Sequence, residues 1–331
     1  MVQPLTAILV GFGHMGRNHE RVLRSTENVS LELVVDPNHD GNHTLSGTKV
    51  VDTLDSVDLA AVDIAVVATP TEGHEDVTVT MIRHGIHVLV EKPLSFDSQS
   101  GERMRVELNA AGLVGAVGHI ERFNPAIREM KKMLEAGELG EVLQISTRRQ
   151  SPRPSRVSDV GVVLDLATHD IDVATWLVGA EFSSVYGCVR PATAASNQED
   201  LSLFLGTLTN GVIVSNVTNW VSPFKERHVV ATGTTGALVA NTVSGELTLY
   251  KEGGSGLDWD KFSFPRGSGA GGVTNLEFPR PEPLRSEIEG FRDQVATGKG
   301  QVVTFSEALR NVLVAEAVIS SSHTREVHTF T

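Results

Sequence analysis

An acid and an imidazole stand four residues apart near the middle of the chain. Asp165 and His169 belong to a stretch whose apolar residues recur at helical spacing, so a helix would place both side chains on one face. There the carboxylate can hold the imidazole in one tautomer and stabilise the imidazolium, which a base needs when it takes a proton from an alcohol. An ordinary ion pair on an exposed helix shows the same spacing, and the spacing alone favours that simpler interpretation. A second motif upstream favours the catalytic interpretation over the ordinary ion pair.

The second signal is a glycine-rich turn that directly follows the first apolar run. Residues 5–10 predict a short strand, and residues 17–23 can continue as a helix after Gly11, Gly13 and Gly16. In such a unit the first glycine permits the tight turn, the second lets a pyrophosphate approach the backbone, and the third lets the helix pack on the strand. The phosphates of a dinucleotide would then lie at the helix N-terminus.

Asp36 supports the same interpretation. It ends the next expected strand, 31–35, and stands 20 residues after Gly16, where an acid accepts hydrogen bonds from the adenine ribose. A dinucleotide site is therefore favoured over a chance glycine loop. The carboxylate would repel a 2'-phosphate, and Pro37 follows it where an arginine could have bound one, so NAD is expected and NADP is disfavoured. Asp36 can also form a turn before Pro37, which is compatible with ribose binding.

Strands and helices alternate over the first 120 residues. Apolar runs predict strands at 62–68, 86–90 and 114–117, and helical spacing predicts helices at 75–84 and 98–111. Strands separated by helices of this length form a doubly wound parallel sheet of the Rossmann type. We therefore expect an α/β dinucleotide-binding domain over residues 1–120.

Two of these strands end in polar motifs, at the edge of the sheet where ligands bind. Thr69 and Pro70 follow one strand, and Glu91, Lys92 and Pro93 follow the next. Lys92 should point towards the place expected for the nicotinamide. The alternative is that Lys92 is an exposed lysine in a loop, and its position alone favours neither interpretation.

Residues 121–331 predict a second, α+β domain for substrate binding and oligomerisation. A helix is expected at 126–136 and closing helices at 284–296 and 306–322, with period-two stretches at 142–148, 183–189, 200–207, 212–220, 227–233, 237–241 and 246–250. Short turns between most of these strands indicate an open, largely antiparallel sheet. The Asp165 helix should cover one face. Another subunit should cover the other, with Val185, Val214, Val217, Trp220 and Val229 as possible contacts.

Composition limits the classes of partner. The 331 residues suit two domains, and 41 acidic residues against 28 lysines and arginines give a formal charge of −13, so nucleic acid is not an expected partner. We expect a cytoplasmic protein with no membrane partner, since we find neither a secretory signal nor an apolar run near the roughly 20 residues of a membrane span. Cys188 is the single cysteine; we expect it to be buried as a small apolar residue, and we expect no metal site.

The motifs together resemble the Gfo/Idh/MocA oxidoreductases, the relatives of glucose-fructose oxidoreductase and inositol dehydrogenase. The resemblance covers essentially the whole chain and rests on Gly11 to Gly16, Asp36, Ala68-Thr69-Pro70, Glu91-Lys92-Pro93 and Gly161-x-x-x-Asp165-x-x-x-His169-Asp170-x-Asp172. It implies that Lys92, Asp165 and His169 are catalytic and surround the reacting hydroxyl. It also implies a cis bond before Pro93 and a homodimer or homotetramer formed through the second sheet. Val162 stands where many members have a second glycine.

These inferences define two sets of residues. The cofactor is expected to contact Gly11, Gly13, His14, Met15, Gly16, Asp36, Thr69, Pro70, His74, Glu91 and Lys92. The substrate is expected to contact Lys92, Arg122, Asn124, Arg153, Arg156, Asp165 and His169. The expected reaction is NAD-dependent oxidation of a secondary hydroxyl of a sugar, in which His169 takes the proton and Lys92 hydrogen-bonds the same oxygen. Which of the two is the ultimate base stays open, because neighbouring groups titrate together.

An arginine cluster bears on the substrate. Arg148, Arg149, Arg153 and Arg156 fall within nine residues of an acidic chain, and guanidinium groups suit a diphosphate. Pairing with local acids such as Asp159 is an alternative of nearly equal weight.

The segments 118–125 and 156–166 resemble the subgroup that oxidises UDP-N-acetyl-hexosamines at C3. A UDP-N-acetylglucosamine-type substrate is therefore predicted, with inositol or another free polyol or sugar as the alternative. A non-catalytic nucleotide-binding sensor is the alternative of another class, although the lysine and the histidine that such a protein could lose are both present. A zinc alcohol dehydrogenase is disfavoured because no cysteine accompanies Asp165, His169 and Asp172 as a ligand.

Overall fold

The computed structural model describes residues 4–39, 47–154, 160–193, 198–251 and 272–330. The chain forms two compact units. The first comprises Met1–Phe123, Ser155–Asp172 and Pro281–Glu316, and the second comprises Asn124–Pro154, Val173–Arg280 and Ala317–Thr331. Within the described ranges, no helix is long and apolar enough to cross a membrane.

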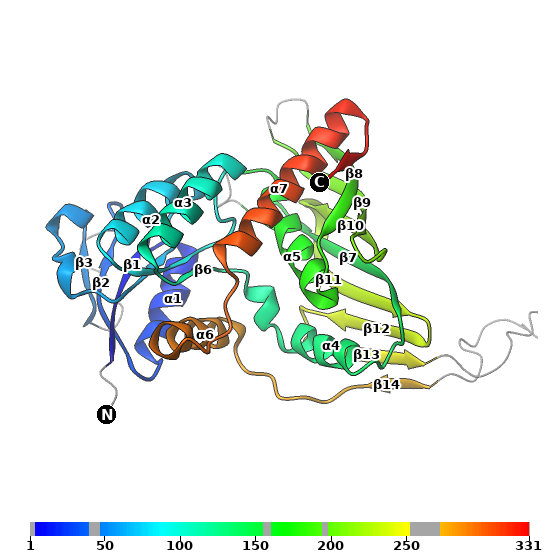
Figure 1. Ribbon diagram of the computed structural model, residues 1–331, viewed down its shortest axis with the longest axis horizontal. Helices are drawn as coiled ribbons and strands as arrows, with labels where there is room; N and C mark the ends of the chain where they lie inside the picture. The colour runs from blue at the N-terminus through cyan, green and yellow to red at the C-terminus, as the bar shows by residue number, and fades with distance from the viewer. Residues whose placement is uncertain (1–3, 40–46, 155–159, 194–197, 252–271, 331) are drawn as a thin grey trace, which may run out of the picture. The chain divides into compact units, whose positions relative to one another are not determined.

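The first unit contains a six-stranded parallel sheet in the order β3-β2-β1-β4-β5-β6 (Figure 1). Its strands are β1 (Leu5–Val10), β2 (Val29–Val35), β3 (Lys49–Val51), β4 (Ile64–Val67), β5 (His87–Val90) and β6 (Gly115–Val117). Its helices are α1 (His14–Arg24), α2 (His74–Arg83), α3 (Ser98–Ala111) and α6 (Pro283–Thr297), with short 3-10 turns at Leu54–Ser56, Leu59–Ala61, Thr71–Gly73 and Ile120–Phe123. This is the doubly wound sheet predicted from the alternation of strands and helices.

Both faces of this sheet are covered by helices. Figure 1 shows α2 and α3 on one face and α1 with α6 on the other. Strands covered on both faces can be apolar at every position, and all four residues of β4 are buried. Helix α6 comes from the last part of the chain, yet its Ile288 and Phe291 join the same core as Leu9 and Val66.

The second unit contains a nine-stranded sheet in the order β14-β13-β12-β11-β7-β10-β9-β8-β15. The strands are β7 (Val142–Pro152), β8 (Phe182–Arg190), β9 (Leu201–Leu208), β10 (Ile213–Asn219), β11 (Val221–Gly233), β12 (Gly236–Asn241), β13 (Glu246–Lys251), β14 (Val273–Asn275) and β15 (His328–Thr329). Only β7 and β10 pair in parallel among these described strands, so the sheet is largely antiparallel, as predicted. Helix α4 (Pro125–Glu135) packs on β12 and β13. Helices α5 (Thr168–Val178) and α7 (Phe305–Thr324) contribute residues to both units.

The prediction of which side chains face outward from this sheet was largely wrong. Val185, Val214, Trp220 and Val229 were expected on the uncovered face, but they are 1–3% exposed. Side chains alternate between faces, so the pattern defines two sets of residues without saying which set is covered. Of the five expected residues, only Val217 belongs to the other set, since it pairs with the exposed Leu203.

The open face of β8, β9 and β10 carries exposed apolar side chains. Tyr186, Leu203, Leu205 and Ile213 are 39–58% exposed. Cys188 lies opposite Leu203 in the register and is exposed. The expectation of a buried Cys188 was therefore wrong, because its position in the alternation directs it to the open face. The glycine- and serine-rich segment 252–272 lies, except for its last residue, outside the described residues.

Candidate active site

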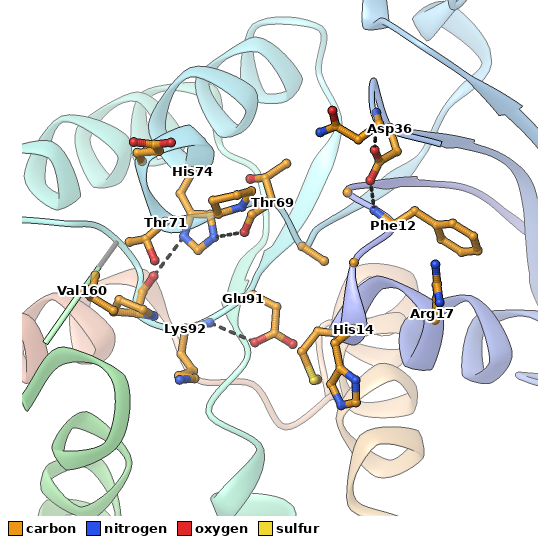
Figure 2. A pocket seen from close by; sticks show the side chains of 18 of the residues that line it. Phe12, His14, Arg17, Asp36, Thr69, Thr71, His74, Glu91, Lys92 and Val160 are labelled. Atoms are coloured by element: carbon orange, nitrogen blue, oxygen red, sulfur yellow. Dashed lines mark hydrogen bonds between the residues drawn. The ribbon is translucent and has the colours of Figure 1, made fainter. Parts of the chain in front are cut away.

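A cavity of about 620 Å³ lies in the first unit, at the carboxyl ends of β1, β4 and β5 (Figure 2). It is lined by the glycine turn, by the end of β2, by the turns after β4 and β5, and by Val160 and Asp165. Of the eleven residues expected to contact the cofactor, ten line this cavity, and Gly16, which is buried, is not among the lining residues. The cavity is therefore at the edge of the sheet that the sequence predicts for ligand binding.

The three glycines of the turn have the three roles expected for a pyrophosphate cradle. Gly11 has φ +96°, and a Cβ there would lie 2.5 Å from the backbone of Ala68. A Cβ on Gly13 would meet nothing within 4 Å, which leaves the backbone open to a ligand. A Cβ on Gly16 would lie 2.1 Å from the Gly11 oxygen, so the helix packs closely on the turn. No side chain caps α1, and its first N–H groups can therefore bind phosphate oxygens. The site fits a dinucleotide.

Asp36 connects the end of β2 to the glycine turn. Its Oδ2 accepts a hydrogen bond from the Phe12 N–H at 2.6 Å, and its Oδ1 accepts one from the Asn38 N–H at 2.8 Å (Figure 2). The second contact forms the turn expected for Asp36 before Pro37, which is compatible with ribose binding. A carboxylate has about four lone-pair sites, so these two contacts leave room for ribose hydroxyl groups.

Lys92 and Asp165 are brought together from positions 73 residues apart. Lys92 Nζ lies 2.5 Å from Asp165 Oδ1 and donates a second hydrogen bond to the Asp165 backbone oxygen at 2.8 Å. The two side chains are only 15% and 6% exposed, so water screens this ion pair weakly. The Lys92–Pro93 bond is cis, as predicted.

The segment that carries Asp165 is wider than the α-helix expected for it. Residues Val163–Ala167 form a π-helix, and α5 begins at Thr168. A π turn closes its hydrogen bonds over five residues and disrupts the regular ladder. Asp165 can thereby present both its backbone oxygen and its carboxylate to Lys92. The expectation of one regular α-helix was wrong for its first turn.

His169 lies in the first turn of α5 and is 7% exposed. Its ring stands edge-on to that of His119, with the centroids 6.3 Å apart. His119 is almost completely buried, and this burial lowers the pKa of its imidazole. A neutral ring beside His169 avoids placing a second positive charge close to Lys92.

Glu91 faces inward from the turn that carries Lys92. Its Oε1 lies 2.7 Å from His19 Nε2, and its Oε2 accepts a hydrogen bond from the Lys92 N–H at 3.2 Å. Burial alone would raise the pKa of Glu91, but the hydrogen bond from His19 and the nearby charges of His19 and Lys92 outweigh it and lower that pKa. Because His19 belongs to α1, this buried pair connects the glycine-turn helix to the lysine turn.

Arg122, expected to contact the substrate, lies in a buried ion-pair network of the first unit. Its Nε and Nη2 donate to the two oxygens of Asp172 at 2.8 and 2.7 Å, and its Nη1 donates to Glu307 at 2.7 Å. Asn311 also donates to Asp172, at 2.8 Å. Burial lowers the pKa of Arg122, but the two carboxylates outweigh it and raise that pKa. These contacts support a structural role, and contact with substrate stays a prediction.

The other residues expected to contact substrate lie in the second unit or outside the described residues. Asn124 caps α4 through a hydrogen bond from the Ala126 N–H at 3.1 Å. Arg153 donates to Asp200 at 2.7 Å and lies over the Trp220 ring, 5.2 Å from its centroid. Arg156 lies outside the described residues.

Several residues of the site were not expected from the sequence. His19, His119 and Glu307 are separated in sequence from their partners, so no local spacing points to them. Arg17 and His39 line the cavity, and of these only Arg17 carried a local signal, since it follows the glycine turn directly.

Known proteins provide an independent comparison. An inositol 2-dehydrogenase 4 of Saccharopolyspora erythraea is 34% identical over 219 residues, which span 62% of this chain and 64% of that protein. A UDP-N-acetylglucosamine 3-dehydrogenase of Acidithiobacillus ferrooxidans is 27% identical over 311 residues, 93% of each chain. The solved structure of GenD2 from gentamicin A biosynthesis in complex with NAD is 25% identical and has a TM-score of 0.83, over 100% of this chain and 97% of that one.

Two domains of one family also match in chain order. Residues 5–119 match the domain described as oxidoreductase family, NAD-binding Rossmann fold. Residues 127–239 match the GFO/IDH/MocA C-terminal domain. The first match contains the glycine turn and Lys92, and the second contains Asp165 and His169. Since both matches agree with the sheets that the structure shows, the chain belongs to the Gfo/Idh/MocA oxidoreductase family, with an NAD-binding Rossmann domain over residues 5–119.

Proposed function

We propose that the protein catalyses the reversible, NAD-dependent oxidation of a secondary hydroxyl group in a sugar-type substrate. The observation that carries the proposal is the contact of Lys92 with Asp165 in the wall of the cavity that the glycine turn also lines. A cationic donor held beside a dinucleotide cradle suits stabilisation of a developing alkoxide.

Each side chain has a defined role in this reaction. An ammonium group has three N–H donors, and Asp165 accepts from Lys92 Nζ with two oxygens, so the third N–H is directed to the substrate oxygen. His169 takes the hydroxyl proton. Asp165 keeps the Lys92 ammonium in place and offsets its charge. NAD, held by the glycine turn and Asp36, would supply the hydride acceptor for the carbinol carbon. The carbonyl product, the protonated histidine and NADH balance the reaction.

For the substrate we propose a UDP-N-acetyl-hexosamine, oxidised at C3. The UDP-N-acetylglucosamine 3-dehydrogenase relative aligns over 93% of each chain, which supports this choice. A free inositol or another polyol is the second candidate. The inositol dehydrogenase relative, at 34% identity, favours it, and so does the pairing of Arg153 with Asp200, which already compensates one arginine of the cluster.

A substrate panel tests the proposal. NADH formation is followed at 340 nm with UDP-N-acetylglucosamine, its uronic acid, myo-inositol and scyllo-inositol, and the product is identified by mass spectrometry. We expect turnover of a UDP-sugar and loss of two mass units. Turnover of a free polyol alone would select the second candidate. NAD binding without turnover of any compound would instead favour a nucleotide-binding sensor.

We also propose that the protein forms a homodimer or homotetramer in the cytoplasm through the open face of β8, β9 and β10. Four apolar side chains that are 39–58% exposed support this, because monomers rarely expose such a cluster. Cys188 lies on the same face and serves as a reporter. A maleimide should label it slowly in the assembled protein, and Leu205→Glu should produce monomers with rapid labelling. Light scattering that gives a monomer for the wild type would reject this interface.

A further inference from the structure

His74 lies between the two turns that border the cofactor cavity. It is the first residue of α2 and is 1% exposed. Its Nδ1 lies 3.0 Å from the Pro93 oxygen and 3.4 Å from the Leu94 oxygen, and its Nε2 lies 3.1 Å from the Thr69 oxygen. Figure 2 shows the ring beside Thr69, with a dashed line to it. One imidazole therefore contacts the turn after β4 and the turn after β5.

These contacts make His74 an unusual residue of the cavity wall. It was expected to contact the cofactor, but both ring nitrogens face backbone oxygens of the protein. Carbonyl oxygens only accept hydrogen bonds, so a ring nitrogen must carry a hydrogen to bond one of them. Both nitrogens thus face the backbone, and each can hold it only while it carries a hydrogen.

The charge of the ring decides how many of these contacts are hydrogen bonds at one time. Burial lowers the pKa of His74 more than the carbonyl contacts and the charge of Glu91 raise it. A neutral imidazole carries a single N–H. Nδ1 faces two carbonyl oxygens and Nε2 faces one, so the hydrogen is most favourably placed on Nδ1. The ring then donates its hydrogen bond to Pro93, the residue after Lys92, and Nε2 has no hydrogen to donate to Thr69.

We propose that His74 is a positioning residue, which holds the Lys92–Pro93 turn through Nδ1–H and thereby sets where Lys92 Nζ meets Asp165 and the substrate oxygen. The part that concerns substrate rests on the proposed dehydrogenase function. The part that concerns the turn does not, because the contacts lie within the protein. Helix α2 and strands β4 and β5 form the fixed frame, and the ring connects the turns that leave it.

Two substitutions of His74 distinguish its contact with Pro93 from its contact with Thr69. The Nδ2 of asparagine occupies the place of histidine Nδ1, and the Nε2 of glutamine that of histidine Nε2. His74→Asn therefore keeps a donor for Pro93, whereas His74→Gln keeps one for Thr69. His84→Gln is the matched control, since His84 ends the same helix and is exposed.

The first readout is hydrogen–deuterium exchange of peptides that cover residues 68–73 and 91–96, and it needs no turnover. We expect His74→Gln to speed exchange in 91–96 and His74→Asn to leave that segment as in the wild type. If the two variants change the exchange rates of both segments to the same extent, the proposal is overturned and His74 has a general packing role. If the glutamine variant does not fold, faster exchange of 91–96 in the asparagine variant alone would overturn it.

The second readout is kinetic and uses the substrate found in the panel. We expect kcat of His74→Gln to fall by about 10²-fold, the effect of a misplacement near 1 Å, with little change in the dissociation constant of NAD. His74→Asn should retain kcat close to that of the wild type. Equal kcat values for the two variants would overturn the proposal. A wild type without any turnover would reject the proposed function while the exchange result still decides the role of His74.

Discussion

Replacing Glu287 by glutamine should change how the stability of the protein depends on pH. Glu287 lies on α6, is 3% exposed, and neither of its carboxyl oxygens has a hydrogen-bond partner among the described residues. Burial raises its pKa well above the usual value, and the negative charges of Glu91 and Asp172 raise it further. The folded protein therefore holds a proton there that the unfolded chain releases.

The sign of the effect follows from that difference. A raised pKa in the folded state adds stability that is fully present below the unfolded pKa and is lost as pH rises through the folded pKa. Between the two pKa values, the wild type loses about 1.4 kcal/mol of unfolding free energy per pH unit from this group. Glutamine has the shape of the neutral acid and cannot ionise, so the variant lacks this loss. The unfolding free energy of Glu287→Gln, relative to that of the wild type, should therefore rise steadily from pH 5 towards neutral pH.

A second replacement gives an absolute magnitude. Burying a polar group without a hydrogen bond costs about 1–3 kcal/mol by mutational data. Glu287→Met removes that cost and keeps a similar length of side chain. It should therefore raise the unfolding free energy by about 1–3 kcal/mol even at acid pH, where the wild-type carboxyl group is neutral in both states.

Urea unfolding followed by circular dichroism, at several values between about pH 3 and pH 8, measures both effects. Glu289→Gln is the control, since Glu289 lies on the same helix and is partly exposed. The glutamine curve for position 287 should diverge from the wild type as pH rises, and the control should not. Parallel curves for the wild type and Glu287→Gln would refute the inference that the folded protein keeps this acid protonated.

Three further predictions concern the site. Lys92→Ala and His169→Ala should each lower kcat by several orders of magnitude while NAD still binds in titration calorimetry; near wild-type kcat in either would remove that residue from the mechanism. Asp36→Ser should shift kcat/KM from NAD towards NADP, and a wild type that already prefers NADP would show that Asp36 does not face the ribose. Arg122→Ala should lower the unfolding free energy by about 3–5 kcal/mol, because it leaves buried carboxylates without their cation; an effect on KM alone, with unchanged stability, would instead support substrate contact.

Elements with a strong apolar period could be predicted from the sequence, and so could the short edge strand β6, but three other short edge strands could not. Helix 98–111 has the bounds expected for it, and β1 has those of its apolar run. Strands β3, β14 and β15 have only two or three residues and lie at or near sheet edges. Such strands are too short for a period to appear, and pairing with a neighbouring strand defines them.

The residues of the site also fall into a group that could be predicted from the sequence and a group that could not. The residues proposed to contact a ligand lie at strand ends, so the place of Gly13, Asp36 and Lys92 in the cavity wall could be predicted from the order of strands and turns. The buried partners could not. His19 is 72 residues from Glu91, and only the packing of α1 against the sheet brings them together. The π turn at Asp165 was equally hidden, because its sequence satisfies a regular helix as well.

From the sequence, diphosphate binding and pairing with local acids explain the arginine cluster about equally well. The contacts in the structure suggest how to distinguish the two explanations. Arg153 pairs with Asp200, which is 3% exposed and also accepts a hydrogen bond from the Ala192 N–H. Arg148 lies 3.7 Å from Glu226. Acids of the second unit therefore offset part of the positive charge.

If Arg153 serves only Asp200, Arg153→Ala should leave a buried carboxylate without its cation. The unfolding free energy should then fall, while the KM values for UDP-N-acetylglucosamine and for a sugar without phosphate should change alike. If Arg153 also binds a diphosphate, KM should rise for the UDP-sugar alone, by roughly the tenfold or more that loss of a charged hydrogen bond of 1.5–3 kcal/mol gives. Arg153→Lys keeps the charge but not the planar pair of donors. If Arg153 only pairs with Asp200, Arg153→Lys should restore the unfolding free energy. If Arg153 also binds a diphosphate, Arg153→Lys should leave the KM for the UDP-sugar raised. The two variants together therefore decide whether the cluster recognises phosphate.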